Sequence, residues 1–153
     1  MKKVFSVLLF LLCILPIFSR NETMSAGLGL EWNMDSRHNF AGGTLLAFDY
    51  RLPHFTSVGL FLTGSTNFNN TYVIEPVLVF RAYYREYEFS GPFFQNELGI
   101  SFITEDGRQT RLPLVGFGTG YRFHAGSSFY LEPYIRIGYP FAFGIGVIAG
   151  ILF

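Results

Sequence analysis

Histidine, serine and acidic residues are the side chains of this sequence that could carry out nucleophilic chemistry. His124 is followed by two serines and Glu132, and His38 lies beside an acid and a serine in another polar segment. A serine nucleophile needs a base within hydrogen-bond reach and a third group that orients the base. Proximity along a turn does not establish that arrangement, and no recognisable catalytic motif surrounds these residues. We therefore interpret the histidines, His54 included, as polar turn residues.

Metal and cofactor chemistry has little support in the residue types. The three histidines are scattered, and the single cysteine, Cys13, lies inside an apolar N-terminal run. No spacing of His, Cys, Asp or Glu matches a zinc site. The segment Glu105-Asp106-Gly107 offers too few ligands in line for calcium. We expect no metal and no cofactor.

Charged residues recur at alternate positions, which is the spacing of side chains on one face of a β-strand. Five acids and five arginines share this face, so it is neutral in total. Buried charges must be paired, and we expect these residues to form a salt-bridged network. The predicted network consists of Glu31, Asp49, Arg51, Glu75, Arg81, Arg85, Glu97, Arg122, Glu132 and Arg136.

The elements that position these charges repeat with a period of two. Apolar residues alternate with small or polar residues in eight segments, and no useful length of helical periodicity occurs. Turn-forming residues such as Ser90-Gly91-Pro92 separate the segments. We predict strands over 24–35, 42–52, 57–68, 72–86, 93–104, 111–123, 128–139 and 142–153.

The glycines indicate which face of these strands is crowded. Twelve of the 17 share the polar phase, at positions 27, 29, 43, 59, 99, 116, 118, 120, 138, 144, 146 and 150. Glycine inside a strand normally marks crowding. A crowded, charge-paired face and a broad apolar face fit a barrel with lipid outside and a narrow polar lumen. We predict an all-β fold, an eight-stranded antiparallel up-and-down transmembrane β-barrel.

The composition favours a membrane barrel over a soluble barrel. Only 14% of the 153 residues are charged and 19% are aromatic, and the formal net charge is zero. A nucleic-acid partner is not expected, because a basic footprint is missing. A soluble barrel would need a wet outer surface, yet the chain has no lysine beyond Lys3.

The N-terminal residues have the anatomy of a secretory signal peptide. Lys2 and Lys3 precede the apolar run Val4 to Phe18, and polar residues follow. We predict Sec-dependent export, with a signal peptide over 1–19 and a barrel over 20–153. Cleavage near Ser19 is favoured, and cleavage after Ala26 is the alternative. An uncleaved anchor is the competing interpretation, although it would need a longer apolar run.

An even number of strands places both termini on the periplasmic side. Aromatic residues of the apolar phase then fall into two belts at the predicted membrane interfaces. The outer belt would contain Trp32, Phe40, Tyr72, Phe102, Tyr139 and Phe143, and the inner belt Tyr50, Tyr84, Phe94, Tyr121, Phe123, Phe129 and Phe153.

Two prolines interrupt the predicted strands, in the matching phrases that end at Pro76 and Pro133. Proline removes a donor from the strand ladder, so we expect bulges there or strands that start a few residues later.

The charges should fill the lumen, because an eight-stranded barrel is just wide enough for side chains. Arg81 is predicted to face Glu97 at similar depth on the next strand. Arg122 and Glu132 are predicted near the periplasmic end, with Arg136 above them. The alternative to a paired plug is a proton or ion relay, which would need a continuous water path.

The end of the chain carries the most specific motif. Ile145, Val147, Ala149, Ile151 and Phe153 share one face of the last predicted strand, and the chain closes on phenylalanine. This strand resembles the signal that outer-membrane barrels present to the barrel-assembly machinery. With the leader and the eight amphipathic strands, the chain resembles the small outer-membrane barrels of the OmpA, OmpX and OmpW kind.

The resemblance implies a location, partners and a choice of functions. The expected location is the outer membrane of a diderm bacterium. Expected partners are outer-membrane lipids and, during biogenesis, the assembly machinery and periplasmic chaperones, and the expected state is a monomer. The expected role is non-enzymatic, in envelope structure or surface contact. One alternative is a conduit for small apolar molecules with a lateral exit. The other is a lipid A-modifying enzyme built around a turn histidine.

Overall fold

A computed structural model describes residues 23–35, 39–68, 70–84, 89–126 and 128–153. The predicted signal peptide lies outside these residues. Eight strands form the fold: β1 (Met24–Asp35), β2 (Phe40–Arg51), β3 (Thr56–Thr66), β4 (Thr71–Tyr83), β5 (Gly91–Glu105), β6 (Arg108–Ala125), β7 (Phe129–Tyr139) and β8 (Phe141–Leu152). Within the described ranges, no helix has the length and apolar character to cross a membrane.

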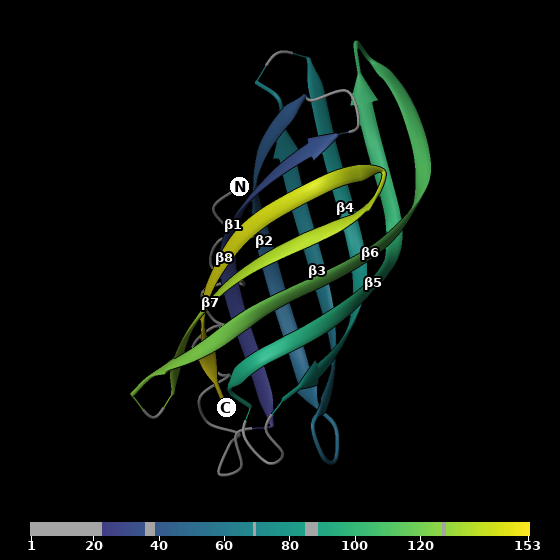
Figure 1. The fold of residues 1–153 in the computed structure, drawn as a ribbon. Helices are drawn as coiled ribbons and strands as arrows, with labels where there is room; N and C mark the ends of the chain where they lie inside the picture. The colour runs from purple at the N-terminus through teal and green to yellow at the C-terminus, as the bar shows by residue number, and fades with distance from the viewer. Residues whose placement is uncertain (1–22, 36–38, 69, 85–88, 127) are drawn as a thin grey trace, which may run out of the picture.

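The strands close into a single barrel, which confirms the predicted fold class. Each strand pairs antiparallel with the next in sequence, and β1 pairs with β8. Just after the end of β8, the amide of Met24 donates to the carbonyl of Phe153 at 2.8 Å, and the amide of Phe153 donates to the carbonyl of Met24 at 2.9 Å. Figure 1 shows the strands wrapped around the barrel axis, with the C-terminus beside the start of β1. We call this end the terminal end and the other the hairpin end.

The strand bounds differ most from prediction in the β5–β6 hairpin. Pairing continues to Glu105 opposite Arg108, so the turn consists of Asp106 and Gly107 alone. Both residues have positive φ, 48° and 76°, as a two-residue hairpin turn of the primed type requires. The prediction ended β5 too early and started β6 too late, because exposed polar residues beside a turn resemble a loop in the sequence.

Alternation along the strands separates an apolar outside from a filled inside. Leu60 and Ile137 point outward and are 63% and 58% exposed, whereas Val79 and Ile148 point inward and are completely buried. The inward set also contains polar and charged side chains. The core of the molecule is therefore the lumen, filled by a mixture of apolar and charged groups.

The prediction of bulges or later strand starts at the two prolines is wrong. Ile74 pairs with Phe102 and Val77 pairs with Gly99, so the register of β4 against β5 is the same on both sides of Pro76. The register of β6 against β7 is likewise unchanged across Pro133. Each proline keeps its pairing with the strand on its other side. Each proline therefore lacks one backbone donor toward one neighbouring strand, but neither strand contains the extra residue that a bulge would add.

Close strand approach near Pro76 depends on a glycine opposite. A Cβ atom added to Gly99 would meet the backbone carbonyl oxygen of Pro76, a rigid neighbour. Gly64, on β3, has nothing within 4 Å of the same added atom. The two positions therefore form a matched pair for substitution.

Gly99→Ala is expected to lower the free energy of unfolding by about 1–3 kcal/mol, because the added methyl group displaces backbone. Gly64→Ala is expected to change it by less than about 0.5 kcal/mol. Urea unfolding of protein refolded into lipid vesicles measures both. Equal midpoints for the two variants would contradict the crowding of this strand pair.

Candidate functional site

The structure brings eight of the ten predicted network residues into the lumen. Glu31, Asp49, Glu75, Arg81, Glu97, Arg122, Glu132 and Arg136 are all buried there. Arg51 is half-buried at the terminal end, and Arg85 lies outside the described residues. These eight buried residues comprise five carboxylates and three guanidiniums. The ten predicted residues are neutral in total, but the eight buried ones are not. The charges form two clusters, each centred on arginine.

The first, which we call the Arg81–Arg122 cluster, is formally neutral. Its two guanidiniums share Asp49 and Glu132. Arg81 lies 2.9 Å from Asp49 and 2.7 Å from Glu132, and Arg122 lies 3.0 Å and 2.6 Å from the same carboxylates. All four side chains are fully buried. The Ser25 hydroxyl also accepts a hydrogen bond from Arg122, at 3.3 Å.

The second, the Arg136 cluster, places three carboxylates on one guanidinium. Arg136 lies 2.8 Å from Glu31, 3.0 Å from Glu75 and 2.8 Å from Glu97. Neutral donors support the carboxylates: Ser101 donates to Glu75 at 2.9 Å, Asn33 donates to Glu31 at 2.7 Å, and the Tyr134 hydroxyl also donates to Glu31. The cluster has a formal charge of −2, so the unbalanced charge of the lumen is concentrated here.

The prediction that Arg81 faces Glu97 is wrong. The β4–β5 register places Arg81 opposite Gln95, and Glu97 opposite Val79. Gln95 connects the two clusters, because it accepts from Arg81 at 3.0 Å and donates to Glu97 at 2.6 Å. Gln95 shares the inward phase of Glu97, so strand alternation alone could have included it. The carboxylate partners of Arg81 come from β2 and β7, which are not its neighbours in the sheet.

Aromatic rings cover the guanidiniums and close the lumen around them. The Arg122 guanidinium carbon lies 4.3 Å from the ring centre of Phe89 and 4.2 Å from that of Tyr130. Arg81 is held between Phe61 and Phe93, at 4.8 Å and 4.6 Å. These distances are typical of cation–π contacts. Arginine and aromatic groups together therefore fill the cross-section at the terminal end.

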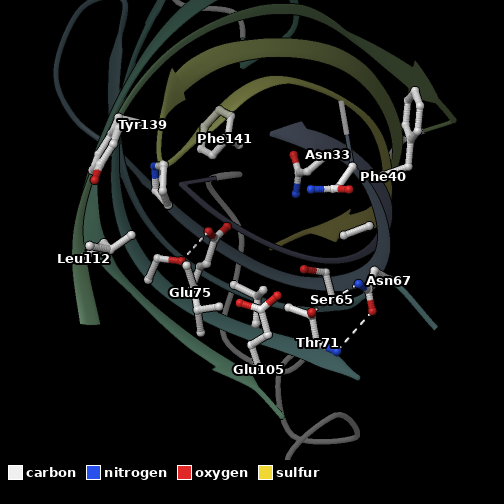
Figure 2. A pocket seen from close by; sticks show the side chains of 16 residues that line it. Asn33, Phe40, Ser65, Asn67, Thr71, Glu75, Glu105, Leu112, Tyr139 and Phe141 are labelled. Atoms are coloured by element: carbon white, nitrogen blue, oxygen red, sulfur yellow. Dashed lines mark hydrogen bonds between the residues drawn. The ribbon is translucent and has the colours of Figure 1, made fainter. Parts of the chain in front are cut away.

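The hairpin end is hollowed instead. A cavity of about 340 Å³ lies there, with Phe141 and Asn33 on one wall and Ser65, Glu75 and Glu105 on another (Figure 2). Phe141 also lies over Arg136, with its ring centre 3.8 Å from the guanidinium carbon. The cavity therefore ends on the Arg136 cluster. The sequence pattern could not predict this cavity, because the depth of the cavity depends on how far each inward side chain extends into the lumen.

The histidines do not form a serine–histidine site among the described residues. His124 Nε2 lies 3.1 Å from the carbonyl oxygen of Phe89, and no hydrogen bond joins it to Ser128. His54 lies in the β2–β3 turn with a φ of 70°. His38 and Ser127 lie outside the described residues. Among the residues that the structure describes, no three His, Cys, Asp or Glu side chains are grouped to hold a metal.

The predicted belt residues lie on the outer surface, with two exceptions. Trp32, Phe40, Tyr50, Tyr72, Tyr84, Phe94, Tyr121, Phe123, Phe129, Tyr139 and Phe143 are exposed there. Phe102 is half-buried, and Arg111 lies 5.6 Å from its ring centre. Phe153 is only 7% exposed, so its assignment to the inner belt is wrong. It follows the last residue of β8, and its backbone still exchanges hydrogen bonds with Met24.

The other residues of the predicted assembly signal follow the alternation. Ile145 and Ala149 are exposed, and Val147 and Ile151 are half-buried on the same outward phase. Their recognition by an assembly machinery stays a prediction.

Comparison with known proteins places the chain at the level of fold. No protein-family model and no curated protein matches it. The neisserial surface protein NspA superposes with a TM-score of 0.61 and 11% sequence identity, covering 84% of this chain and 94% of that one. The N-terminal barrel domain of Pseudomonas aeruginosa OprF gives a TM-score of 0.58 and 12% identity, covering 84% and 97%. A de novo designed transmembrane β-barrel gives 0.54 and 11%, covering 86% and 98%.

The chain has the fold of a small transmembrane β-barrel. The predicted resemblance to eight-stranded outer-membrane barrels is thereby confirmed in architecture. At 11–12% identity the comparison carries the fold alone, so the role of the lumen has to be argued from its own residues.

Arg122→Met is expected to lower the free energy of unfolding by about 3–5 kcal/mol, because it leaves two buried carboxylates short of a partner. The control is Arg111→Met, on the outer surface, for which about 0–1 kcal/mol is expected. The double variant Arg122→Met/Glu132→Gln should lose less than the two single variants combined, because the pair is removed together. Urea unfolding in vesicles measures all four. Additive effects would contradict a coupled ion pair.

Proposed function

We propose that this chain is an integral outer-membrane barrel with a closed lumen, which serves envelope structure or surface contact and acts neither as a channel nor as an enzyme. The observation that carries the proposal is the Arg81–Arg122 cluster. Its four charged side chains have no exposed surface. A water-filled pore would have to break ion pairs that connect β2, β4, β6 and β7.

The outer surface supports a location in the membrane. Its exposed side chains are largely aliphatic and aromatic across every strand, as a lipid-facing barrel requires. The similar folds of NspA and OprF support the outer membrane of a diderm bacterium. On this proposal the lipids of that membrane are the permanent partners of a monomeric barrel. Chaperones and the assembly machinery would act on it during biogenesis.

A conduit with a lateral exit is less well supported. The outer surface has two apolar grooves of about 590 Å³, one at Pro133 and one at Pro76. Each lies where a proline interrupts a strand ladder. Behind them, however, the lumen is occupied by buried Tyr134 and by buried Phe61 and Val77. The grooves therefore do not continue into an internal path.

A lipid A-modifying enzyme has no supporting geometry among the described residues. Such chemistry needs a base beside a nucleophile, and the contact of His124 is with a backbone carbonyl. The buried acids and arginines of the described residues are ion-paired with one another within the lumen.

The protein is expected to show no discrete conductance steps in planar lipid bilayers, because the ion pairs of the lumen leave no continuous water path. Faster migration of unboiled than of boiled protein on a detergent gel shows that the sample is folded. A water-filled porin reconstituted in the same way is the positive control. Reproducible steps from folded protein would contradict the closed lumen.

Topology gives a separate expectation for whole cells. An epitope inserted at Gly107, in the β5–β6 turn, should be labelled on intact cells, and one inserted at Gly126, in the β6–β7 turn, only after permeabilisation. Both are glycines of exposed turns with positive φ, 76° and 83°, so the insertions are matched. Labelling of the Gly126 insertion alone would reverse the orientation, and fractionation away from the outer membrane would contradict the location.

A further inference from the structure

The cavity at the hairpin end is separate from the closed part of the lumen and has its own electrostatic character. Two carboxylates line it: Glu75 is 3% exposed at its floor, and Glu105 is exposed at its rim. Beneath it lies the Arg136 cluster, which has three carboxylates for one guanidinium. The summed formal charge of these groups is therefore negative.

An anion is a poor occupant of this cavity. The guanidinium of Arg136 is the cationic group beneath the floor, and each of its nitrogens already donates to a buried side chain. Nε donates to Asn33, Nη1 to Glu97, and Nη2 to Glu31, Glu75 and Asn33. Phe141 lies over the same guanidinium. An anion would meet carboxylates before it met a free donor.

One hydroxyl group that lines the cavity has no hydrogen-bond partner among the described residues. Ser65 is 8% exposed and makes no hydrogen bond with any residue that the structure describes. Other polar side chains of the cavity are engaged: Ser101 donates to Glu75, and the Asn67 side chain donates to the Thr71 hydroxyl at 3.1 Å. Figure 2 shows Ser65 on the wall that carries Glu75, directed into the cavity. The Ser65 hydroxyl is not among the fully enclosed polar atoms that lack a partner, so it opens into the cavity, where it can accept a hydrogen bond from a bound group.

We propose that this cavity binds a small organic cation, whose protonated primary amine contacts Glu75 and Ser65. An ammonium group has three donors and no acceptor, which matches a carboxylate and a hydroxyl that can accept. A second amine at the other end of the ligand would lie near Glu105 at the rim. The volume is in the range of small-molecule sites.

A bare divalent cation fits the same charge less well. Calcium takes six to eight oxygen ligands, and magnesium keeps a nearly octahedral shell. The described residues contain no group of three acidic or histidine side chains arranged for a metal. Both oxygens of Glu75 also accept hydrogen bonds, from Ser101 and from Arg136. An ammonium can share such oxygens, whereas a metal ion would have to displace those donors.

The test uses 1,4-diaminobutane as the probe, titrated calorimetrically into the full mature barrel in detergent micelles. Saturable binding is expected for the diamine, and none for 1,4-butanediol or succinate, which have the same carbon chain without the positive charge. Equal binding of the diol would overturn the proposal. Saturable binding of magnesium chloride without binding of the diamine would also overturn it, and would assign the cavity to a metal.

Variants locate the binding site. Ser65→Ala is expected to weaken diamine binding about 2- to 12-fold, the equivalent of one neutral hydrogen bond. Glu75→Gln is expected to weaken it about tenfold or more, because the lost partner is charged. Ser128→Ala, in the β6–β7 turn at the terminal end, is the matched control and should leave affinity unchanged.

Folding of each variant is checked by its gel mobility before and after boiling. If Glu75→Gln does not fold, Ser65→Ala still decides the question, because it removes one oxygen atom and no charge. Diamine affinity that is unchanged in folded Ser65→Ala would overturn the proposal.

Discussion

A charge buried in a narrow barrel must find its partner inside that barrel, and this constraint shapes the rest of the structure. Arg122 of β6 reaches Asp49 of β2 and Glu132 of β7, while Arg81 of β4 reaches the same two carboxylates. Backbone ladders join each strand only to its neighbours. The ion pairs add contacts across the barrel, and so they specify how strands far apart in the ladder face one another.

The same constraint explains the composition of the inward face. Arginine offers donors in a planar fork that one or two carboxylates can occupy together, and its guanidinium also stacks on aromatic rings. All three buried cations are arginines, and each has at least one ring within 4.8 Å. Large side chains can cross the lumen because glycines share their face. A narrow barrel that buries large side chains such as arginine therefore also needs glycines on the same face.

Strand alternation made the fold and the inward face predictable from the sequence. Period-two patterning separates the faces of every strand, and glycine and charge on one phase identify the lumen. The partners inside the lumen were less predictable. Arg81 has carboxylates from β2 and β7 as partners, not Glu97 of the adjacent strand, because contacts across a barrel depend on shear and side-chain length. Local rules also failed at Pro76, where the strand ladder continues without a bulge, and at Phe153, which is buried although it shares the outward phase.

The two ends of the lumen differ in a way that neither neutrality nor burial alone would reveal. At the terminal end, the charges are balanced and covered by aromatic rings. At the hairpin end, an excess of carboxylates lies below an open cavity that contains an unpaired hydroxyl. Stability alone would favour a balanced cluster at both ends, since unbalanced buried charge is costly. The proposed cation would meet this excess of carboxylates and would balance charge that the arginines of the lumen leave uncompensated.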